Sequence, residues 1–556
     1  MLLPSGIEDF KDIIEGNYYY IDKTGLIGDI LRDGANAILI TRPRRFGKSL
    51  NFSMLKYFFS NEKDYSYLFK GLKIENDPLA LEHMNKYPVI HITFKDAKTS
   101  SWEETYDVLK SVISKEYDKH SYLLESEKLR EHHKKYIIKI LEKRGEPVDY
   151  RESLYNLTYF LETHFGKKVI LLIDEYDVPI ESGYVNGYYE KVVDFMRGML
   201  TAALKGNSSL FKGLLTGVYR VAKEDIFSGL NNLVVYTILD DFYSPYFGFT
   251  EEEVKKMLSD FNMEDRYEEI KKWYDGYTFG NAEGIYNPWS VIECVRRKVA
   301  QAYWINTSSN DLIRELILKS PSNVKKKIEL LLSGECLTEM IESTSALRDL
   351  KYENGQINEN AMWGLFLFGG YLTARDKKID STFGQWVCEL SPPNKEVLAF
   401  YRTTIINWLK GFGFEYVKIE QMLEYLFEKK GEAFEREFND ILVKVSSYHM
   451  FADEAEKVYQ AFVLGMLSVA GERFEVKSER ESGFGRYDVV IIDRKTPRAI
   501  IMEFKVSEDD LAKDALKALE QIENKKYEAD LRDRGIDNIV KVGIAFKGKS
   551  CSCRIA

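Results

Sequence analysis

Short apolar runs alternate with amphipathic stretches over roughly the first 240 residues of the chain. The runs are continuous, which indicates strands that are buried on both faces of a sheet. Between them, apolar residues recur at helical spacing. The pattern predicts an α/β domain over residues 1–240, in which helices cover a parallel sheet. The predicted strands are Ala37–Ile40, Val89–Phe94, Val169–Ile173 and Phe211–Val218.

The pattern changes beyond residue 240. Residues 241–392 are mostly helical in pattern, and Pro392-Pro393 interrupts that pattern and predicts a boundary. A helical connector is expected over residues 393–445, and a small α/β domain over residues 446–556. In the last domain a helix is expected around Asp453–Leu467, followed by two strands joined by a turn. The two predicted strands are Arg486–Ile492 and Ala499–Lys505.

The first predicted strand leads into the sequence Arg42-Pro43-Arg44-Arg45-Phe46-Gly47-Lys48-Ser49 and then into a helical pattern. Backbone N–H groups at a helix N-terminus form an anion cradle, and Lys48 could reach the β- and γ-phosphates of a nucleotide. Ser49 would then hold Mg²⁺. Arg42 stands where the general pattern has its first glycine, so a basic surface turn is the alternative.

A second motif strengthens the nucleotide hypothesis. Asp174 and Glu175 directly follow the apolar run that ends at Ile173. In P-loop ATPases, the first acid at such a strand end helps to hold Mg²⁺, and the adjacent glutamate polarises the attacking water. A buried strand that meets a solvated turn would explain the apolar run, but not its pairing with Gly-Lys-Ser in the same chain.

Thr216 and Arg220 lie at the end of the last predicted strand of this domain. Thr216 is a candidate to sense the γ-phosphate. Arg220 is a candidate to neutralise charge that develops in phosphoryl transfer, in its own site or in a neighbour's. Ordinary loop residues are the alternative for both positions. We expect the helical segment over residues 241–392 to form a lid over the nucleotide.

The C-terminal domain carries a second set of chemical groups. Asp488 lies on the first of its two predicted strands, and Glu503 and Lys505 lie two residues apart on the second, hence on the same face. The two carboxylates could bind Mg²⁺, with Mn²⁺ as an alternative, while Lys505 activates water for attack on a phosphodiester. A half-buried ion pair is the alternative. Basic residues suited to a DNA backbone, or to a solvated face, are Lys477, Arg480, Arg486, Arg494 and Arg498.

Together the segments resemble the predicted AAA-type ATPases of bacteria and archaea that carry a C-terminal PD-(D/E)xK nuclease-like domain. Beyond the motifs above, the matching stretches are Gly6–Phe10, Tyr20–Thr24, Phe227–Asn232, Trp273–Tyr277 and Tyr286–Ser290. The resemblance covers nearly the whole chain, and Arg42 at the first glycine position is usual in that group. It implies a P-loop NTPase sheet with a helical lid, plus a small restriction-endonuclease-like α/β domain.

The resemblance also implies functional residues. Tyr487 replaces the proline of the nuclease motif, which is harmless because the carboxylate does the chemistry. Glu456 is implied as a third metal ligand, and Gln521 and Tyr527 as residues that position a phosphate. The residues implied in ATP binding are Arg44, Arg45, Phe46, Gly47, Lys48, Ser49, Thr216 and Arg220.

The charge, the apolar runs and the cysteines of the chain exclude several classes of protein. The 556 residues carry a formal net charge of −10, so DNA contact must be local and a basic nucleic-acid coat is excluded. No apolar run is long enough to span a bilayer and the start lacks a leader pattern, so we expect a cytoplasmic protein without membrane contact. Five scattered cysteines indicate neither a disulfide framework nor a zinc site.

The sequence thus favours an ATP- and Mg²⁺-dependent enzyme whose C-terminal domain cuts DNA. Foreign or mobile DNA is a target suggested by family analogy alone. One alternative is a nucleotide-driven switch whose nuclease-like domain only binds a partner. Another alternative keeps the ATPase and replaces DNA with a protein client. Assembly into a homo-oligomer is left open.

Overall fold

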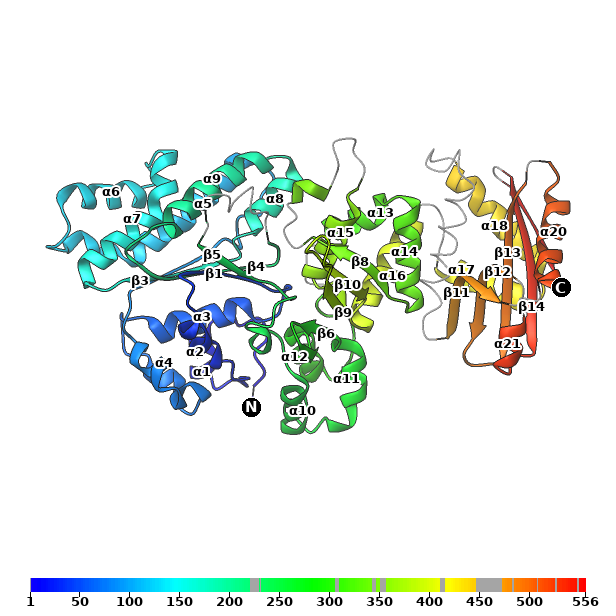
Figure 1. Ribbon diagram of the computed structural model, residues 1–556, viewed down its shortest axis with the longest axis horizontal. Coiled ribbons are helices and arrows are strands. Elements are labelled where there is room, and N and C mark those ends of the chain that lie inside the picture. The colour runs from blue at the N-terminus through cyan, green and yellow to red at the C-terminus, as the bar shows by residue number, and fades with distance from the viewer. Residues whose placement is uncertain are drawn as a thin grey trace. The chain divides into compact units, whose positions relative to one another are not determined.

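The chain divides into two compact units in a computed structural model (Figure 1), Met1–Ser308 with Thr338–Glu396, and Ser309–Leu337 with Val397–Ala556. The boundaries predicted at residues 240, 392 and 445 stay predictions. Within the described part of the chain, no helix is both long and apolar enough to cross a membrane. The described residues are 2–220, 230, 232–305, 310–342, 347–350, 357–410, 416–446, 473–482, 485–507, 509–525, 528–547 and 550–556.

A five-stranded parallel sheet organises the first unit. Its order is β2 (Val89–Thr93), β3 (Val169–Asp174), β4 (Leu210–Gly217), β1 (Ala37–Thr41) and β5 (Leu233–Tyr236). All neighbouring strands are parallel. The predicted parallel α/β sheet is confirmed, although the short fifth strand was not predicted. Because β4 lies between β1 and β3, the carboxyl ends of these three strands are adjacent.

Helices cover both faces of this sheet. Figure 1 shows α5, α6, α7 and α9 on one face and α1 to α4 on the other. The helices are α1 (Phe10–Glu15), α2 (Gly25–Arg32), α3 (Lys48–Phe59), α4 (Pro78–His83), α5 (Trp102–Lys119), α6 (Glu131–Leu141), α7 (Pro147–Phe165), α8 (Val178–Asn186) and α9 (Tyr189–Leu204). Short 3₁₀ helices in the same unit cover Ser66–Phe69, Lys73–Asn76, Ser121–Glu125, Ser244–Tyr246, Glu264–Arg266 and Leu347–Leu350.

Local chemistry sets the ends of these helices. At the start of α7, the Glu146 carboxylate and the Asp149 carboxylate form a reciprocal capping box, and Pro147 occupies the first helical position. The helix ends at Gly166, whose φ of 68° is in the left-handed region that favours glycine.

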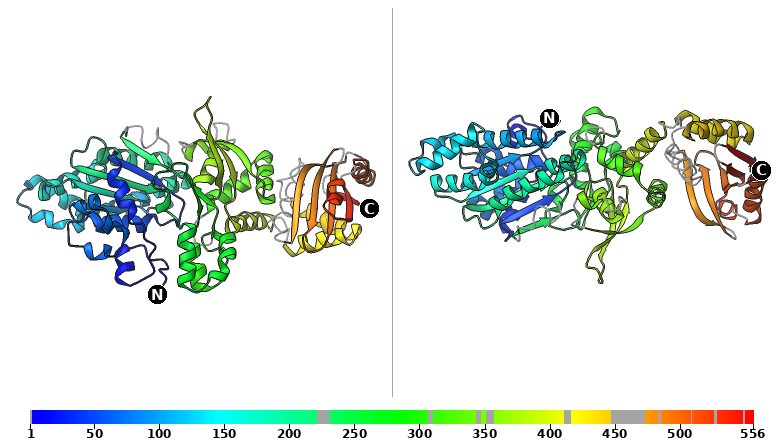
Figure 2. Two further views of the ribbon diagram at one scale, coloured as in Figure 1. Left: turned by 60° about the horizontal axis from the view of Figure 1, so that its bottom comes forward. Right: turned by 90° about the horizontal axis from the view of Figure 1, so that it is seen from above.

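The segment beyond the sheet mixes helices with strands. Sequence periodicity predicted mostly helices there and missed two small sheets, because three- to seven-residue strands carry little periodic signal. Figure 2 shows the β9–β10 hairpin projecting from this unit. The helices are α10 (Glu251–Asp260), α11 (Tyr267–Tyr274), α12 (Pro288–Arg297) and α15 (Glu359–Phe368). The strands are β6 (Tyr277–Phe279), β7 (Ala282–Ile285), β8 (Leu337–Ile341), β9 (Thr373–Ile379) and β10 (Trp386–Ser391).

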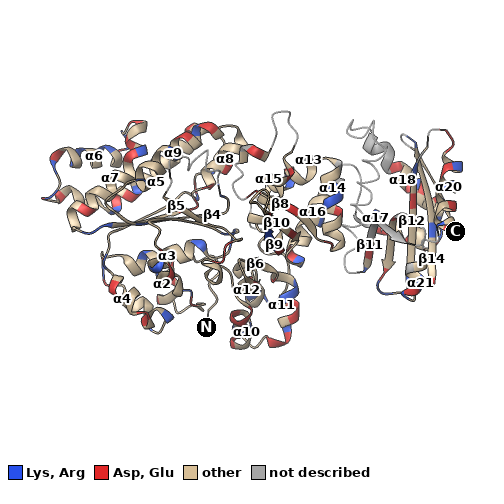
Figure 3. Ribbon diagram, viewed as in Figure 1, with Lys and Arg blue, Asp and Glu red and all other residues tan. Residues whose placement is uncertain are grey.

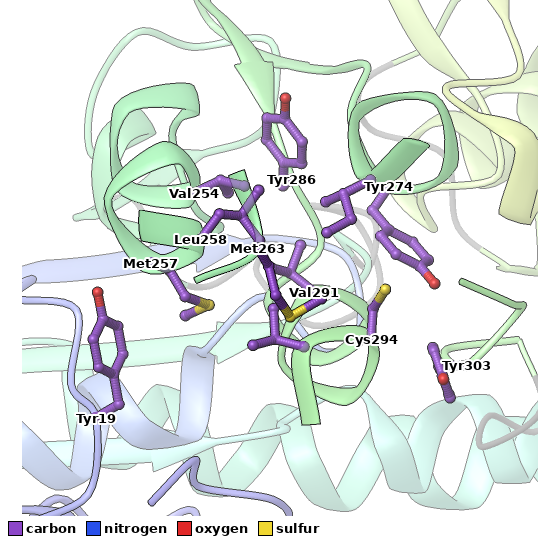
Figure 4. Packing of buried hydrophobic residues seen from close by; sticks show 12 residues of the cluster. Tyr19, Val254, Met257, Leu258, Met263, Tyr274, Tyr286, Val291, Cys294 and Tyr303 are labelled. Atoms are coloured by element: carbon purple, nitrogen blue, oxygen red, sulfur yellow. The ribbon is translucent and has the colours of Figure 1, made fainter. Parts of the chain in front are cut away.

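A buried apolar cluster joins this segment to the N-terminal part of the chain (Figure 4). Val254, Met257 and Leu258 of α10 pack with Val291 and the rest of the cluster, which is completed by Tyr19, Met263, Ile270, Tyr274, Tyr286, Cys294, Val295 and Tyr303. Tyr19 comes from the segment before α2, so the N-terminal residues and helices α10 to α12 share one core.

The second unit centres on a mixed five-stranded sheet, in the order β11 to β15. Strands β13 and β14 are parallel and the other neighbours are antiparallel. Both predicted strands are confirmed as β12 and β13, whereas the helix predicted around Asp453–Leu467 lies outside the described residues. The strands are β11 (Phe474–Ser482), β12 (Gly485–Asp493), β13 (Arg498–Val506), β14 (Asn538–Lys547) and β15 (Ser550–Ile555).

One helix, α20 (Leu511–Asn524), packs tightly on this sheet. A Cβ atom at Gly543 of β14 would lie 2.2 Å from the Ala515 carbonyl oxygen, so only glycine permits this approach. The remaining helices are α13 (Asp311–Lys319), α14 (Ser322–Ser333), α16 (Lys395–Lys410), α17 (Tyr416–Phe427), α18 (Gly431–Ser446) and α21 (Ala529–Asp533).

Arg42, directly after β1, is a fully buried structural residue. Its guanidinium donates hydrogen bonds to the carbonyl oxygens of Thr41 at 2.8 Å, Phe242 at 3.0 Å and Tyr236 at 3.3 Å. It also lies 5.3 Å from the ring centroid of Phe247. Arg42 therefore holds the end of β1 against β5 and the residues after it.

We expect Arg42→Gly, which restores the general phosphate-loop pattern, to destabilise the first unit by about 3 kcal/mol or more, because buried carbonyls lose their donors. Scanning calorimetry would measure the loss. Arg45→Gly is the control, since Arg45 has a φ of 69° and glycine there should cost less than about 1 kcal/mol. Equal stability of Arg42→Gly and the unaltered protein would contradict the structural role.

Candidate functional site

The loop between β1 and α3 has the backbone geometry of an anion cradle. Arg45 and Gly47 have φ values of 69° and 83°, which turn the chain sharply before α3. Gly47 is the N-cap of α3, and the helix begins at Lys48. The first N–H groups of a helix have no partner within the helix, so those of Lys48 and Ser49 are positioned to meet an anion.

Lys48 is buried and folds back onto its own loop. Its ammonium group donates hydrogen bonds to the carbonyl oxygens of Pro43 at 2.9 Å and Arg42 at 3.1 Å. Burial lowers the pKa of Lys48, while the charges of Glu175 and Asp174 act in the opposite direction. Lys48 is therefore held at the mouth of the loop, beside both predicted acids.

Asp174 and Glu175 lie opposite the loop, at the end of β3. Burial raises the pKa of Asp174, and a hydrogen bond with Ser49 and the charge of Lys48 oppose the rise. The Asp174 Oδ1 atom is buried without a hydrogen-bond partner among the described residues. Burial and the charge of Asp174 raise the pKa of Glu175, and Lys48 lowers it. The structure thus brings Lys48, Ser49, Asp174 and Glu175 together.

Thr216 and Arg220 are placed differently from each other. The Thr216 hydroxyl is buried and donates a hydrogen bond to the Ile40 carbonyl oxygen at 3.0 Å, so it joins β4 to β1. Burial lowers the pKa of Arg220, and the opposing charges come from Tyr176 and Asp240. Thr216 lies at the strand ends beside the loop, whereas Arg220 interacts with groups outside the predicted catalytic pair.

The other loop residues have three different environments. The Arg44 guanidinium forms an ion pair with Glu181 of α8, with Nη2 2.5 Å from Oε2. The Arg45 guanidinium lies 4.5 Å above the ring centroid of Trp289. The Phe46 side chain is buried against the Tyr277 ring, at a centroid distance of 4.9 Å, so only its backbone is available to a ligand.

Sequence reasoning missed Asp177. Its buried carboxylate accepts hydrogen bonds from the N–H groups of Val218 at 2.8 Å and Tyr219 at 2.9 Å. Burial raises the pKa of Asp177 to about 6 even though these donors lower it. Asp177 thereby holds the end of β4 beside the predicted catalytic pair. The third acid in Asp174-Glu175-Tyr176-Asp177 was the available signal.

An apolar cavity of about 80 Å³ lies directly beside the phosphate loop. It is lined by segments that are far apart in the sequence, so no single motif could have revealed it. The lining residues include Tyr20, Ile21, Gly47, Leu50, Phe249 and Met257. A flat apolar group attached to a bound phosphate chain could enter here.

The second unit brings Asp488, Glu503 and Lys505 together with Gln521 of α20. Gln521 donates a hydrogen bond from Nε2 to Glu503 Oε1, and its Oε1 accepts one from the Lys505 ammonium at 2.9 Å. Asp488 Oδ2 accepts a hydrogen bond from the Phe504 N–H at 2.7 Å. Of the two residues implied on the later helix, Gln521 lies in the cluster and Tyr527 lies outside the described residues.

Glu503 is a buried carboxyl beside a second acid. It is 5% exposed, and burial followed by the charge of Asp488 raises its pKa to about 8. Lys505 opposes the rise. The Glu503 Oε2 atom is buried without a hydrogen-bond partner among the described residues. An unpartnered carboxylate oxygen beside a second carboxylate is an arrangement that a divalent cation would satisfy.

The remaining predicted residues of this unit are only partly described. Glu456 lies outside the described residues, and the part of the chain that is described contains no group of three or more His, Cys, Asp or Glu residues suited to a metal ion. The side chains of Lys477, Arg480 and Arg486 are also outside the description. Arg498 pairs with Asp493 at 3.0 Å and Arg494 with Glu475 at 3.8 Å, so both have acidic partners.

Comparison with known proteins identifies both regions. Residues 4–227 match the family described as "Predicted AAA-ATPase", and residues 454–554 match the PD-(D/E)XK nuclease superfamily. A protein of Azotobacter chroococcum mcd 1, described as "Uncharacterized protein in vnfD 5'region", is 25% identical over an alignment of 561 positions. The alignment covers 99% of this chain and 97% of the relative. The chain therefore joins a predicted AAA-ATPase-like domain to a C-terminal domain of the PD-(D/E)XK nuclease superfamily.

Proposed function

We propose that the first unit binds and hydrolyses ATP with Mg²⁺, and that the second unit cleaves DNA with Mg²⁺ or Mn²⁺. The observation that carries the ATPase proposal is the meeting of Lys48 and Ser49 with Asp174 and Glu175 at adjacent strand ends. The nuclease proposal rests on the hydrogen-bonded cluster of Glu503, Lys505 and Gln521 beside Asp488.

In the proposed ATP site, each group has one task. Lys48 exchanges its two carbonyl partners for phosphate oxygens, which keeps its buried charge compensated. Ser49 and Asp174 would hold Mg²⁺, and the unpartnered Asp174 Oδ1 supports that role. When bound, the ion neutralises phosphate charge. Glu175 accepts a proton from the attacking water, because burial and Asp174 raise its pKa and make it a better base.

The adjacent apolar cavity, at about 80 Å³, is smaller than the roughly 300–1,000 Å³ of typical ligand pockets, so it would have to widen to take the nucleobase. It opens beside Gly47 and Leu50, so a base held there leaves its phosphates near the N-terminus of α3. Thr216 is proposed as the residue that senses the γ-phosphate, although its hydroxyl first has to leave Ile40. Arg220 would neutralise the charge that develops in phosphoryl transfer only after its side chain has moved. It would do so in its own site or in a neighbour's.

In the proposed nuclease site, Asp488 and Glu503 would hold the divalent ion, with Glu456 as a third ligand. When bound, the ion activates water and stabilises the phosphate that is attacked. Gln521 fixes Glu503 and Lys505 in one arrangement through its amide, and Lys505 then orients the water. DNA contact would be local, because acidic and basic residues intermingle along the helices (Figure 3).

The second candidate is a nucleotide-driven switch whose nuclease-like domain only binds a nucleic-acid or protein partner. The pKa of Glu503, at about 8, favours this candidate, because a neutral carboxyl is a poor metal ligand at pH 7. Foreign or mobile DNA, cytoplasmic location and a homo-oligomeric state stay predictions from sequence and resemblance.

Glu175→Gln should bind ATP normally but hydrolyse it about 100-fold or more slowly, because the general base is lost. Lys48→Ala should lose ATP binding itself, since no other ammonium replaces it. Phosphate release and titration with a fluorescent ATP analogue separate the two effects. Unchanged hydrolysis in Glu175→Gln would contradict the assigned base.

Asp488→Asn should reduce nicking of supercoiled plasmid in Mg²⁺ or Mn²⁺ by about 100-fold, because the metal loses a charged ligand. Lys517→Ala serves as the matched control, since Lys517 belongs to the same unit and pairs with Asp514 on the surface of α20. Gel analysis of plasmid forms measures both. Nicking that persists in Asp488→Asn would refute the site.

Metal binding to the second unit should strengthen as the pH rises towards 8. The raised pKa of Glu503, at about 8, keeps the carboxyl protonated at lower pH, and the metal must displace that proton. Affinity for Mn²⁺ should change about tenfold per pH unit below pH 8 and level off above it. Calorimetric titration from pH 6 to 9 tests this.

The stability of the folded protein should depend on pH in the opposite direction to its metal affinity. The folded state binds the Glu503 proton more tightly than the unfolded state does, so stability should fall as the pH rises from the usual 4.5 to about 8. Glu503→Gln removes the titrating group and should flatten both profiles. A pH-independent Mn²⁺ affinity in the unaltered protein would show that Glu503 is not a ligand.

A further inference from the structure

We propose that Arg44 contacts the γ-phosphate of bound ATP, and that Glu181 holds Arg44 aside until the triphosphate arrives. This assignment rests on the proposed ATP site and adds a residue, Glu181, to it. It also makes Arg44, rather than Arg220, the cation that distinguishes ATP from ADP.

The ion pair joins two elements that border the site. Arg44 belongs to the phosphate loop, four residues before Lys48, and Glu181 belongs to α8, the helix that follows Asp174 and Glu175. Nη2 of Arg44 lies 2.5 Å from Oε2 of Glu181. The side chains are 26% and 14% exposed, so the pair is largely shielded yet open at one side.

Arg44 lies within electrostatic reach of the predicted catalytic groups. Burial lowers the pKa of Lys48, and the positive charge of Arg44 lowers it further. Burial and Asp174 raise the pKa of Glu175, and Arg44 is among the charges that oppose the rise. Arg220 instead interacts with Tyr176 and Asp240. Of the two arginines, Arg44 is the one that lies in the phosphate loop itself.

The surroundings restrict where Arg44 can go. Tyr219 and Tyr371 both interact electrostatically with the guanidinium, and the Tyr219 N–H is held by Asp177. On the loop itself, a Cβ atom at Gly370 would lie 2.8 Å from Pro43 Cβ, so the turn before Tyr371 packs against the residue preceding Arg44. A local change of partner is therefore favoured over a large movement of the loop.

The chemistry of the exchange favours a triphosphate. A guanidinium binds carboxylate and phosphate oxygens with the same planar fork of donors. Leaving Glu181 without a new anion would separate a shielded guanidinium from its carboxylate partner, which is costly. Arg44 should thus leave Glu181 only when a phosphate replaces the carboxylate. ADP lacks the terminal phosphate, so it should leave the Arg44–Glu181 pair intact.

Binding of a non-hydrolysable ATP analogue and of ADP, measured by calorimetric titration, tests the exchange in the full-length chain. Arg44→Ala should weaken binding of the analogue about 30-fold or more while ADP changes less than about threefold. Glu181→Gln should strengthen binding of the analogue about threefold or more, because a competing carboxylate is removed. The double variant should match Arg44→Ala, since Glu181 acts only through Arg44.

The controls separate this role from a structural one. Arg151→Ala removes a more exposed ion pair of the same unit, with Asp194 at 2.6 Å, and should leave the ratio of ATP to ADP affinity unchanged. Arg44→Lys and Glu181→Gln give the answer if Arg44→Ala fails to fold, because lysine lacks the fork and should retain only part of the discrimination.

Two outcomes would overturn the assignment. An unchanged ratio in Glu181→Gln and Arg44→Lys, with normal ATP binding, would reduce the pair to a structural contact and leave the proposed ATPase standing. An unaltered protein that binds neither nucleotide would remove the proposed function, and the role of Arg44 with it.

Discussion

The position of β4 between β1 and β3 is the constraint on which the chemistry of the first unit depends. Parallel pairing places the carboxyl ends of these three strands at one edge. Lys48 therefore meets Asp174 although more than 120 residues separate them in the sequence. The same arrangement buries charges of both signs, and each pKa shift in the site follows from that burial. A triphosphate with its cation would compensate these charges, as the carbonyl oxygens of Arg42 and Pro43 do for Lys48 and the Glu181 carboxylate does for Arg44.

The second unit also places charged groups close together in a shielded position, and fewer opposite charges compensate them. Asp488 and Glu503 come from neighbouring antiparallel strands, and Gln521 of α20 spans Glu503 and Lys505. The close approach of α20 at Gly543 is what brings the Gln521 amide to the sheet. Two carboxylates in a shielded place repel each other, and this repulsion with burial raises the pKa of Glu503. The packing therefore supports the proposal of a cation site in which both carboxylates are ionised once a cation is bound.

Sequence patterns predicted the buried strands well, because a continuous apolar run that ends in Asp174-Glu175 or begins at Asp488 leaves few other interpretations. They failed where the signal was short or non-local. Strands β5 to β10 are brief, and the cavity beside Gly47 is assembled from distant segments. Asp177 was missed, since its backbone partners directly after β4 cannot be read from spacing. Arg42 could have belonged to a basic surface turn, whereas its guanidinium is fully buried and ties β1 to the residues that follow β5.

Together, the proposals give one chain a nucleotide site and a separate cation-dependent cleavage site. The most direct measurement is plasmid cleavage by the full-length protein in Mg²⁺ or Mn²⁺, with ATP, with ADP and without nucleotide, beside the Lys48→Ala protein. We expect cleavage that depends on divalent cation and responds to ATP, and a loss of that response in Lys48→Ala. Intact plasmid in every lane, together with measurable ATP hydrolysis, would contradict the cleavage site and leave a nucleotide-driven switch.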